Sequence, residues 1–165
     1  MRPLPVALLS LAFLVSCAQK TTPPASAQSG ANAVSNGSGA QAAARLTVAD
    51  LDARMKTVGT ALGALRMKLM TDALGDAAKD AQTLAVTFGE VERFFQQRNR
   101  VDAVTWAQQA RKSAQEAAGA ATAGDRAKAS TAMTTLQQQC SQCHAAYREG
   151  DAQTGYRIKA GTVEP

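Results

Sequence analysis

Two cysteines and a histidine lie close together near the end of this 165-residue chain, in the sequence Cys140-Ser141-Gln142-Cys143-His144. Thiols three residues apart lie on one face of a helix, so both can reach the same bound group. The C-x-x-C-H spacing is the attachment signature of c-type haem, in which each thiol adds to one vinyl group of the porphyrin. The histidine is then placed as the proximal ligand of the iron. The motif therefore predicts one covalently attached haem c.

Zinc binding and thiol redox chemistry are the alternative interpretations of these residues. A structural zinc site takes four ligands, mostly from cysteine and histidine. His144 is the only histidine, and the one remaining cysteine, Cys17, is distant in the sequence. A C-x-x-C redox pair is expected beside a βαβ pattern, and the sequence has none. Haem explains the motif better than either alternative.

The N-terminal segment has the features of an export signal. Arg2 precedes an apolar run of 13 residues, 4–16, which is too short to span a bilayer. The run leads into the tetrapeptide LVSC, ending at Cys17, which resembles the lipobox of bacterial lipoproteins. In those proteins the cysteine is acylated and becomes the first residue after cleavage. We predict a signal peptide over 1–17 with lipidation at Cys17; an ordinary secretory leader cut near Ala27 is the alternative.

Export is consistent with haem attachment, which takes place outside the cytoplasm in bacteria. Residues 18–45 are rich in Ser, Gly, Ala, Asn and Gln and lack apolar periodicity, which predicts a flexible linker. Such a linker spans about 30 Å root mean square, so a lipid at Cys17 would hold a folded domain close to a membrane. The expected location is the periplasmic side of a bacterial membrane. Ala18, in place of the Asp associated with inner-membrane retention, favours the outer membrane.

A single folded domain is expected over 46–150, followed by a polar, irregular tail over 151–165. No proline occurs between Pro24 and Pro165, so no residue there forces a helix to break. Ala, Leu, Gln, Lys and Arg are common in the domain, whereas β-branched and aromatic residues are scarce, and this composition favours helix over strand.

Apolar residues recur at helical spacing in four segments of the domain. The segments are expected to begin near Thr47, Asp76, Asp102 and Asp125, and the last two to stop before Gly124 and Gly150. Short connections between long amphipathic helices make neighbouring helices antiparallel. The sequence therefore predicts an all-α, up-down four-helix bundle with haem near the end of the fourth helix.

The third segment has an unusually thin apolar face made of alanines. They are Ala103, Ala107, Ala110, Ala114, Ala117 and Ala121. Such a stripe allows close helix packing, as do Gly59 and Gly63, and it also leaves volume for a large planar group inside the bundle. A core so poor in aromatic residues would gain much of its apolar mass from a porphyrin, so we expect the haem-free chain to be weakly folded.

The position of the motif at the end of a bundle leads to a family resemblance. The stretch from Cys140 to Arg148 resembles that of the cytochrome c′ family, in which C-x-x-C-H-x-x-Y-R closes the fourth helix, and the resemblance covers 46–150. It implies thioether bonds at Cys140 and Cys143, iron ligation by His144, and a position for Arg148 beside the proximal haem face. A solvated cation that is favoured at a helix C-terminus is the other interpretation of Arg148.

The sixth position of the iron decides the function. It is filled by one of four methionines, Met55, Met67, Met70 or Met133, or it is empty. Met55 lies roughly 10 Å along the first helix and His144 roughly 8 Å from the end of the fourth, at the same height in an antiparallel pair. Met67 and Met70 lie about 18 Å or more further along, and Met133 shares the helix of His144. We predict Met55 as the distal ligand, in agreement with the family pattern; an ordinary core methionine is the alternative.

His/Met ligation predicts an electron carrier, because a thioether ligand favours Fe(II) and raises the reduction potential. The alternatives are a gas-binding protein with an open or displaceable distal site for NO or CO, and a structural haem that fills the core. No acid–base pair or nucleophile constellation is visible, so no enzyme activity is expected. The expected partners are redox proteins of the cell envelope and, through the lipid, a membrane. The family also implies a homodimer formed through the first two helices.

Charged residues give two further expectations. Many members of the family have an arginine four residues before the distal position, near a haem propionate, whereas this chain has Leu51 there, and Arg54 or Lys56 could substitute. The formal net charge is +5, but 46–150 has 13 Lys and Arg against 11 Asp and Glu, a net charge of +2. The domain has no cationic cluster with interleaved aromatic residues, so no nucleic-acid binding is expected.

Overall fold

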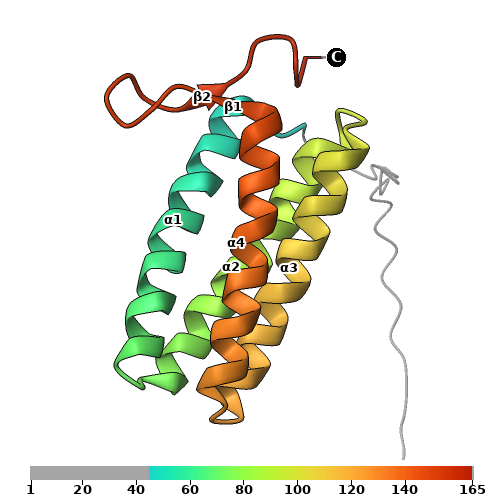
Figure 1. Cartoon of the computed structure of the whole chain (residues 1–165). Coiled ribbons are helices and arrows are strands. Elements are labelled where there is room, and N and C mark those ends of the chain that lie inside the picture. The colour runs from blue at the N-terminus through green and yellow to red at the C-terminus, as the bar shows by residue number, and fades with distance from the viewer. Residues whose placement is uncertain (1–44, 165) are drawn as a thin grey trace, which may run out of the picture. The chain divides into compact units, whose positions relative to one another are not determined.

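The computed structural model describes residues 45–164; the predicted signal peptide with Cys17 and the linker up to residue 44 lie outside the described residues. Four helices follow one another along the chain: α1 (Val48–Met70), α2 (Leu74–Gln96), α3 (Val101–Thr122) and α4 (Arg126–Tyr147). Two short strands come after them, β1 (Arg148–Glu149) and β2 (Arg157–Ile158). The helices alternate in direction (Figure 1). The predicted all-α, up-down four-helix bundle is confirmed.

Side-chain caps fix the first residues of two helices. The Thr47 hydroxyl accepts a hydrogen bond from the backbone N–H of Asp50 at 3.1 Å, and the Asp50 carboxylate accepts one from the N–H of Thr47 at 2.7 Å, which completes a capping box. Asp125 caps α4 by accepting from the N–H of Lys128 at 2.9 Å. Both predicted starting points are confirmed.

The other two helices begin slightly earlier than predicted. α2 begins two residues before Asp76 and α3 one residue before Asp102, and neither has a side-chain cap. The two aspartates lie instead in the first helical turn, where the helix dipole favours a negative charge. At the other end of α3, Gly124 has φ +77°, and the N–H of Asp125 donates to the carbonyl of Ala120 at 2.9 Å. This left-handed residue ends the helix where the sequence predicted.

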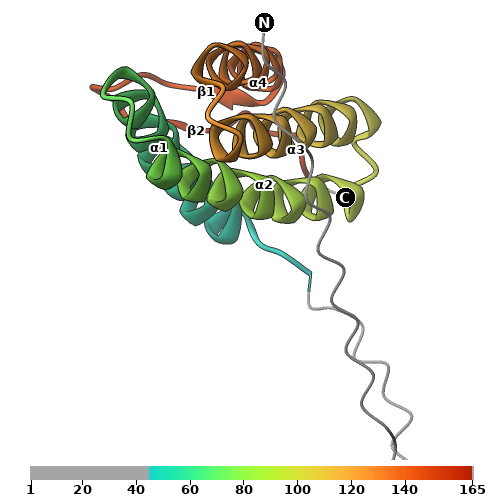
Figure 2. The same ribbon diagram turned by 90° about the horizontal axis from the view of Figure 1, so that it is seen from below.

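The helices pack in series around the bundle. α2 packs against α1 and α3, and α3 packs against α4, whereas α1 and α4 touch at few points. Figure 2 shows α1 and α4 at the two ends of this series. The largest fully buried side chains are Phe94, Phe95, Leu65, Leu84 and Leu136. The bundle is therefore closed tightly on three sides and loosely between α1 and α4.

The alanine stripe of α3 and the two glycines of α1 differ in burial. All six alanines are buried, so neighbouring helices cover the stripe and the close-packing interpretation applies to it. Gly59 and Gly63 are exposed, and a Cβ added to either would meet no other heavy atom within 4 Å. The expectation that these glycines allow close helix packing is wrong.

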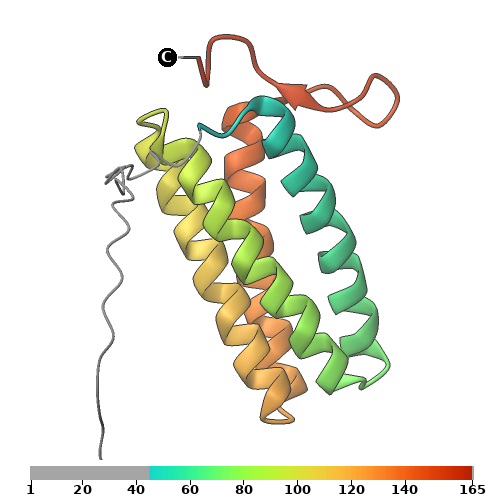
Figure 3. The ribbon, with the colours of Figure 1, turned by 180° about the vertical axis from the view of Figure 1, so that it is seen from behind.

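The tail contains structure that the sequence did not predict. β1 and β2 pair as an antiparallel ribbon with Arg148 opposite Ile158, and the tail passes over the end of the bundle where α1 begins (Figure 3). Gly150 has φ +84°, and a Cβ there would collide with the carbonyl oxygen of Gly155. Apart from the two residues of β2 the tail is made of turns and irregular segments, as expected, and it supplies donors to the last carbonyl groups of α4.

Lys159 provides two of the hydrogen-bond donors to the last carbonyl groups of α4. The backbone N–H of Lys159 donates to the carbonyl of Tyr147 at 2.9 Å, and its Nζ donates to the carbonyl of Ala145 at 2.7 Å. Val163 is buried against the core and anchors the tail further along. No helix within residues 45–164 has the length and apolar character needed to cross a membrane.

Candidate functional site

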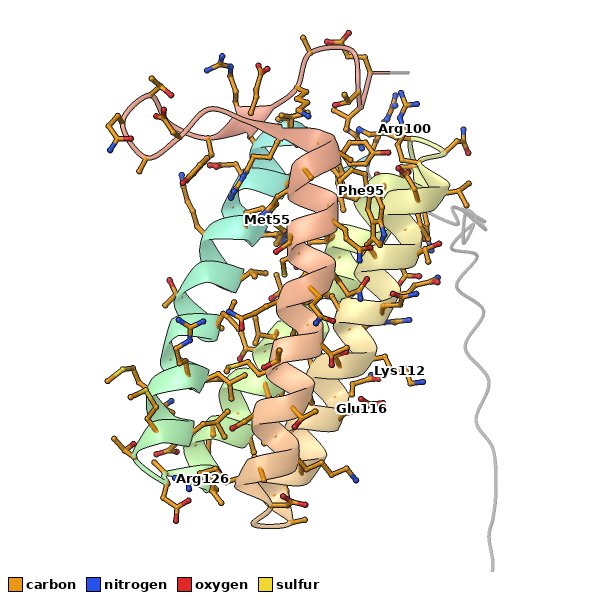
Figure 4. The ribbon with its side chains drawn as sticks, in the orientation of Figure 1. Met55, Phe95, Arg100, Lys112, Glu116 and Arg126 are labelled. Atoms are coloured by element: carbon orange, nitrogen blue, oxygen red, sulfur yellow. The ribbon has the colours of Figure 1, made fainter. Side chains whose placement is uncertain are left out.

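The motif and Met55 lie at the same end of the bundle. α1 begins at the end where α4 finishes (Figure 1), and Figure 4 shows Met55 in the upper half of α1, on the side toward α4. Met133 and Met70 line a shallow pocket at the opposite end. Met67 and Met70 are also 59% and 70% exposed. Of the four candidate methionines, Met55 is thus the one that the fold places at the level of His144.

The two cysteines are free thiols on the last turns of α4. Both are half-buried and pack against the core. Burial raises the pKa of the Cys140 thiol to about 11. Burial, and then the neighbouring charges of Cys140 and Asp102, raise the pKa of the Cys143 thiol to about 12. In the folded chain at neutral pH both groups are therefore protonated thiols.

His144 follows directly on the same helix and is half-buried. Burial lowers the pKa of its imidazole, and the nearby cation of Arg148 lowers it further. The ring is therefore neutral at pH 7, with one nitrogen lone pair available to a metal.

Arg148 is held by a residue that the sequence analysis did not identify. Its guanidinium carbon lies 4.2 Å from the centre of the Tyr156 ring, a cation–π contact made across the ribbon. Its backbone N–H donates to the carbonyl of His144. The structure thus brings Arg148 and His144 together. No local pattern could have indicated Tyr156, because this contact depends on strand pairing in the tail.

Tyr147 connects the last turn of α4 to α3 and α2. Its hydroxyl donates to Oδ1 of Asp102 at 2.6 Å, and its ring centre lies 5.1 Å from that of Phe95 and 6.5 Å from that of Trp106. Burial, and then the bond to Asp102, raise the pKa of Tyr147 to about 12, and the same bond lowers the pKa of Asp102. Asp102 lies 45 residues before Tyr147, so sequence reasoning missed the pair.

Both α1 and α4 have half-buried apolar side chains that pack against the core. The half-buried apolar residues of the two helices include Met55 and Leu62 on α1, and Met133, Cys140, Cys143 and Ala146 on α4. Because α1 and α4 make few contacts, these side chains are only partly covered. Two free thiols and a neutral imidazole on one helix, with a thioether at the same end of the other, form a donor set that fits a covalently bound haem.

The two expected substitutes for a propionate-binding arginine are both paired. The Arg54 Nε lies 2.6 Å from a carboxylate oxygen of Glu90 on α2, and the Lys56 Nζ lies 2.7 Å from a carboxylate oxygen of Asp52. Leu51, at the family's arginine position, is buried in the core.

Within the described residues, no three side chains of the His, Cys, Asp and Glu types gather as a metal-binding group. Comparison of the chain with protein-family models, curated proteins and solved structures finds no match.

Proposed function

We propose that this chain is a membrane-tethered c-type cytochrome with one haem that carries electrons, with His144 and Met55 as the axial ligands of its iron. The observation that supports this best is the C-x-x-C-H motif at the end of α4 together with a half-buried Met55 at the same end of α1. When bound, the haem supplies an iron centre that accepts and releases one electron. Its redox partners would be proteins of the cell envelope.

Four residues of the chain would have different roles in binding the haem. The Cys140 and Cys143 thiols would each bond to one of its two vinyl groups and so anchor it to α4. The neutral imidazole of His144 would offer a nitrogen lone pair to the iron, and the Met55 sulfur would be a soft donor that favours Fe(II). His144 and Met55 both lie on helices and not on loops.

Binding of NO or CO is the alternative function, and one observation favours it. α1 is held mainly by α2 and only weakly by α4, so the position of Met55 depends on one helix–helix contact. A distal ligand on such a helix can withdraw from the iron and leave a site for a small gas molecule.

The spin state of the iron tests the proposal. In the purified protein we expect haem that stays attached after denaturation and a low-spin ferric spectrum, because imidazole and thioether together give a strong ligand field. Met55→Ala should convert the ferric protein to high spin and allow the reduced protein to bind CO readily. Leu62→Ala, which truncates another half-buried apolar residue of α1, is the matched control and should remain low-spin.

Absorption and electron paramagnetic resonance spectra of the three proteins measure this directly. A high-spin wild type that Met55→Ala leaves unchanged would contradict electron transfer through His/Met iron and favour gas binding. Loss of the haem on denaturation of the wild type would contradict the c-type assignment itself.

The tether is tested separately through Cys17. If Cys17 is lipidated, Cys17→Ser should move the protein from the membrane fraction to the soluble fraction, with its spectrum unchanged. Fractionation and immunoblotting of wild type and variant measure the change. An unaltered distribution would show that the proposed lipid does not hold the protein at the membrane.

A further inference from the structure

A pocket of about 780 Å³ lies at the end of the bundle where α1 begins, and none of the motif residues lines it. Three segments form it: residues 45–48 at the start of α1, Arg98 just after α2, and parts of the tail between 157 and 164. We call it the tail pocket. Its volume is within the range that small-molecule sites occupy.

The charged side chains of the tail pocket are mostly positive. They are Arg45, Arg98, Arg157 and Lys159, with one carboxylate, Glu164. Arg157 is neutralised by Glu149, whose carboxylate lies 2.8 Å from its Nε. Arg45, Arg98 and Lys159 form no ion pair with any residue that the structure describes. Burial lowers the pKa of Arg98, and the nearby charge of Arg45 lowers it further.

The rest of the lining is mainly apolar and held in place. The apolar residues that line the tail pocket include Leu46, Ile158 and Val163, and Val163 is largely buried. The Arg98 Nη2 donates to the carbonyl of Leu46 at 2.7 Å, and the Leu46 N–H donates to Oε1 of Gln97 at 2.8 Å. These bonds fix the segment before α1 to the end of α2. The side of the tail pocket formed by Leu46 and Arg98 is therefore held in place before any ligand binds, which lowers the cost of binding.

We propose that the tail pocket binds a carboxylate group carried on an apolar body, with the carboxylate near Arg45 and Arg98 and the apolar part against Leu46, Ile158 and Val163. Two molecules have this chemistry. One is a free organic acid with an alkyl chain, such as a fatty acid. The other is the haem of the proposed function, through its propionates, and this second source rests on that proposal whereas the first does not.

Octanoate is the probe, titrated by calorimetry into the full-length protein, with its haem content recorded. Octanol has the same chain without the charge, and acetate has the charge without the chain. Arg45→Gln removes the charge at a residue that donates no hydrogen bond to any described residue, so the fold should remain intact, and Arg45→Lys restores the charge. Lys112→Gln, at an exposed cation of α3 (Figure 4), is the matched control.

Binding of a free acid predicts saturable octanoate binding that weakens about tenfold in Arg45→Gln, as expected for loss of a charge-assisted contact. Arg45→Lys should recover most of the affinity, and octanol and acetate should bind at least tenfold more weakly. Occupancy by the propionates predicts no octanoate binding to the haem-loaded chain, but a lower reduction potential in Arg45→Gln than in Lys112→Gln.

Any of three results would overturn the proposal. The first is octanoate affinity that is equal in wild type, Arg45→Gln and Lys112→Gln, and the second is octanol binding that is as tight as octanoate binding. The third is absence of octanoate binding combined with equal reduction potentials in the two variants. A chain that carries no haem would contradict the proposed function, yet its octanoate titration would still test the tail pocket.

Discussion

Burial makes the thiols of Cys140 and Cys143 poorly reactive toward haem, because it raises their pKa values. With pKa values of about 11 and 12, roughly one Cys140 side chain in ten thousand is a thiolate at pH 7. A thiol in that state is a poor nucleophile, and half-burial restricts access to it. If the chain carries the proposed haem, attachment is therefore expected to precede the packing of α4 against the core.

Alkylation rates test this view of the thiols. In haem-free folded protein, the rate of reaction with iodoacetamide should rise about tenfold per pH unit between pH 7 and 10, because the thiolate fraction rises by that factor below the pKa. In urea the same rate should level off above about pH 8.5, the ordinary value for cysteine. Mass spectrometry of quenched samples gives both profiles. A folded-state rate that levels off near pH 8.5 would show that burial does not raise these pKa values.

At the scale of the elements, the bond between Tyr147 and Asp102 connects the last turn of α4 to the first turn of α3. The pKa of Asp102 is lowered in the fold, chiefly by this bond. The unfolded chain therefore takes up this proton more readily than the folded one. The contribution of Asp102 to stability is fully present above its unfolded pKa near 3.8 and is lost as pH falls through the lower folded value.

Asp102→Asn should therefore destabilise the protein at pH 7 by about 1 kcal/mol, a value reduced for the exposure of Asp102. At pH 3 the difference from wild type should shrink. Urea unfolding at the two pH values measures this, with Glu116→Gln, an exposed carboxylate of α3 (Figure 4), as the control. Equal destabilisation at both pH values would show that ionisation of Asp102 is not involved.

The sequence predicted the helices better than their connections. Thr47, Asp125 and Gly124 are local signals whose caps and left-handed turn do not depend on the rest of the fold. The pairing of Tyr147 with Asp102, and of Arg148 with Tyr156, depends on which elements meet in space. Helical spacing and antiparallel order were enough to bring Met55 to the end of the bundle where His144 lies, because both follow from the regular rise of a helix.

At the scale of the whole molecule, α1 is the helix least supported by the others. Its main attachments are to α2, through buried residues such as Leu65 and the ion pairs of Arg54 with Glu90 and Lys68 with Asp80. α2 packs closely on α3, and α3 packs closely on α4. Without a haem, the bundle should therefore behave as a three-helix core with a fourth helix attached along one side.

Native-state hydrogen exchange should detect this difference. In haem-free protein, the backbone amides of α1 should exchange through openings of lower free energy than those of α2 and α3, because fewer contacts are lost when α1 separates. If the proposed haem is bonded to α4 and ligated by Met55, the difference should narrow in haem-loaded protein, since such a group would link α1 to α4. Uniform protection of all four helices in the haem-free chain would contradict a loosely held α1.

Gly150 leads to a consequence for the recognition of related chains. Its positive φ and the carbonyl oxygen of Gly155 exclude any side chain at this position, and it lies six residues after His144. As sequences diverge, a lineage that retains the β-ribbon must retain glycine at this offset, whereas a lineage that loses the ribbon is free to vary there. A C-x-x-C-H motif followed six residues later by glycine is therefore a short search pattern that distinguishes bundles with a capped fourth helix from bundles that end in an uncapped one.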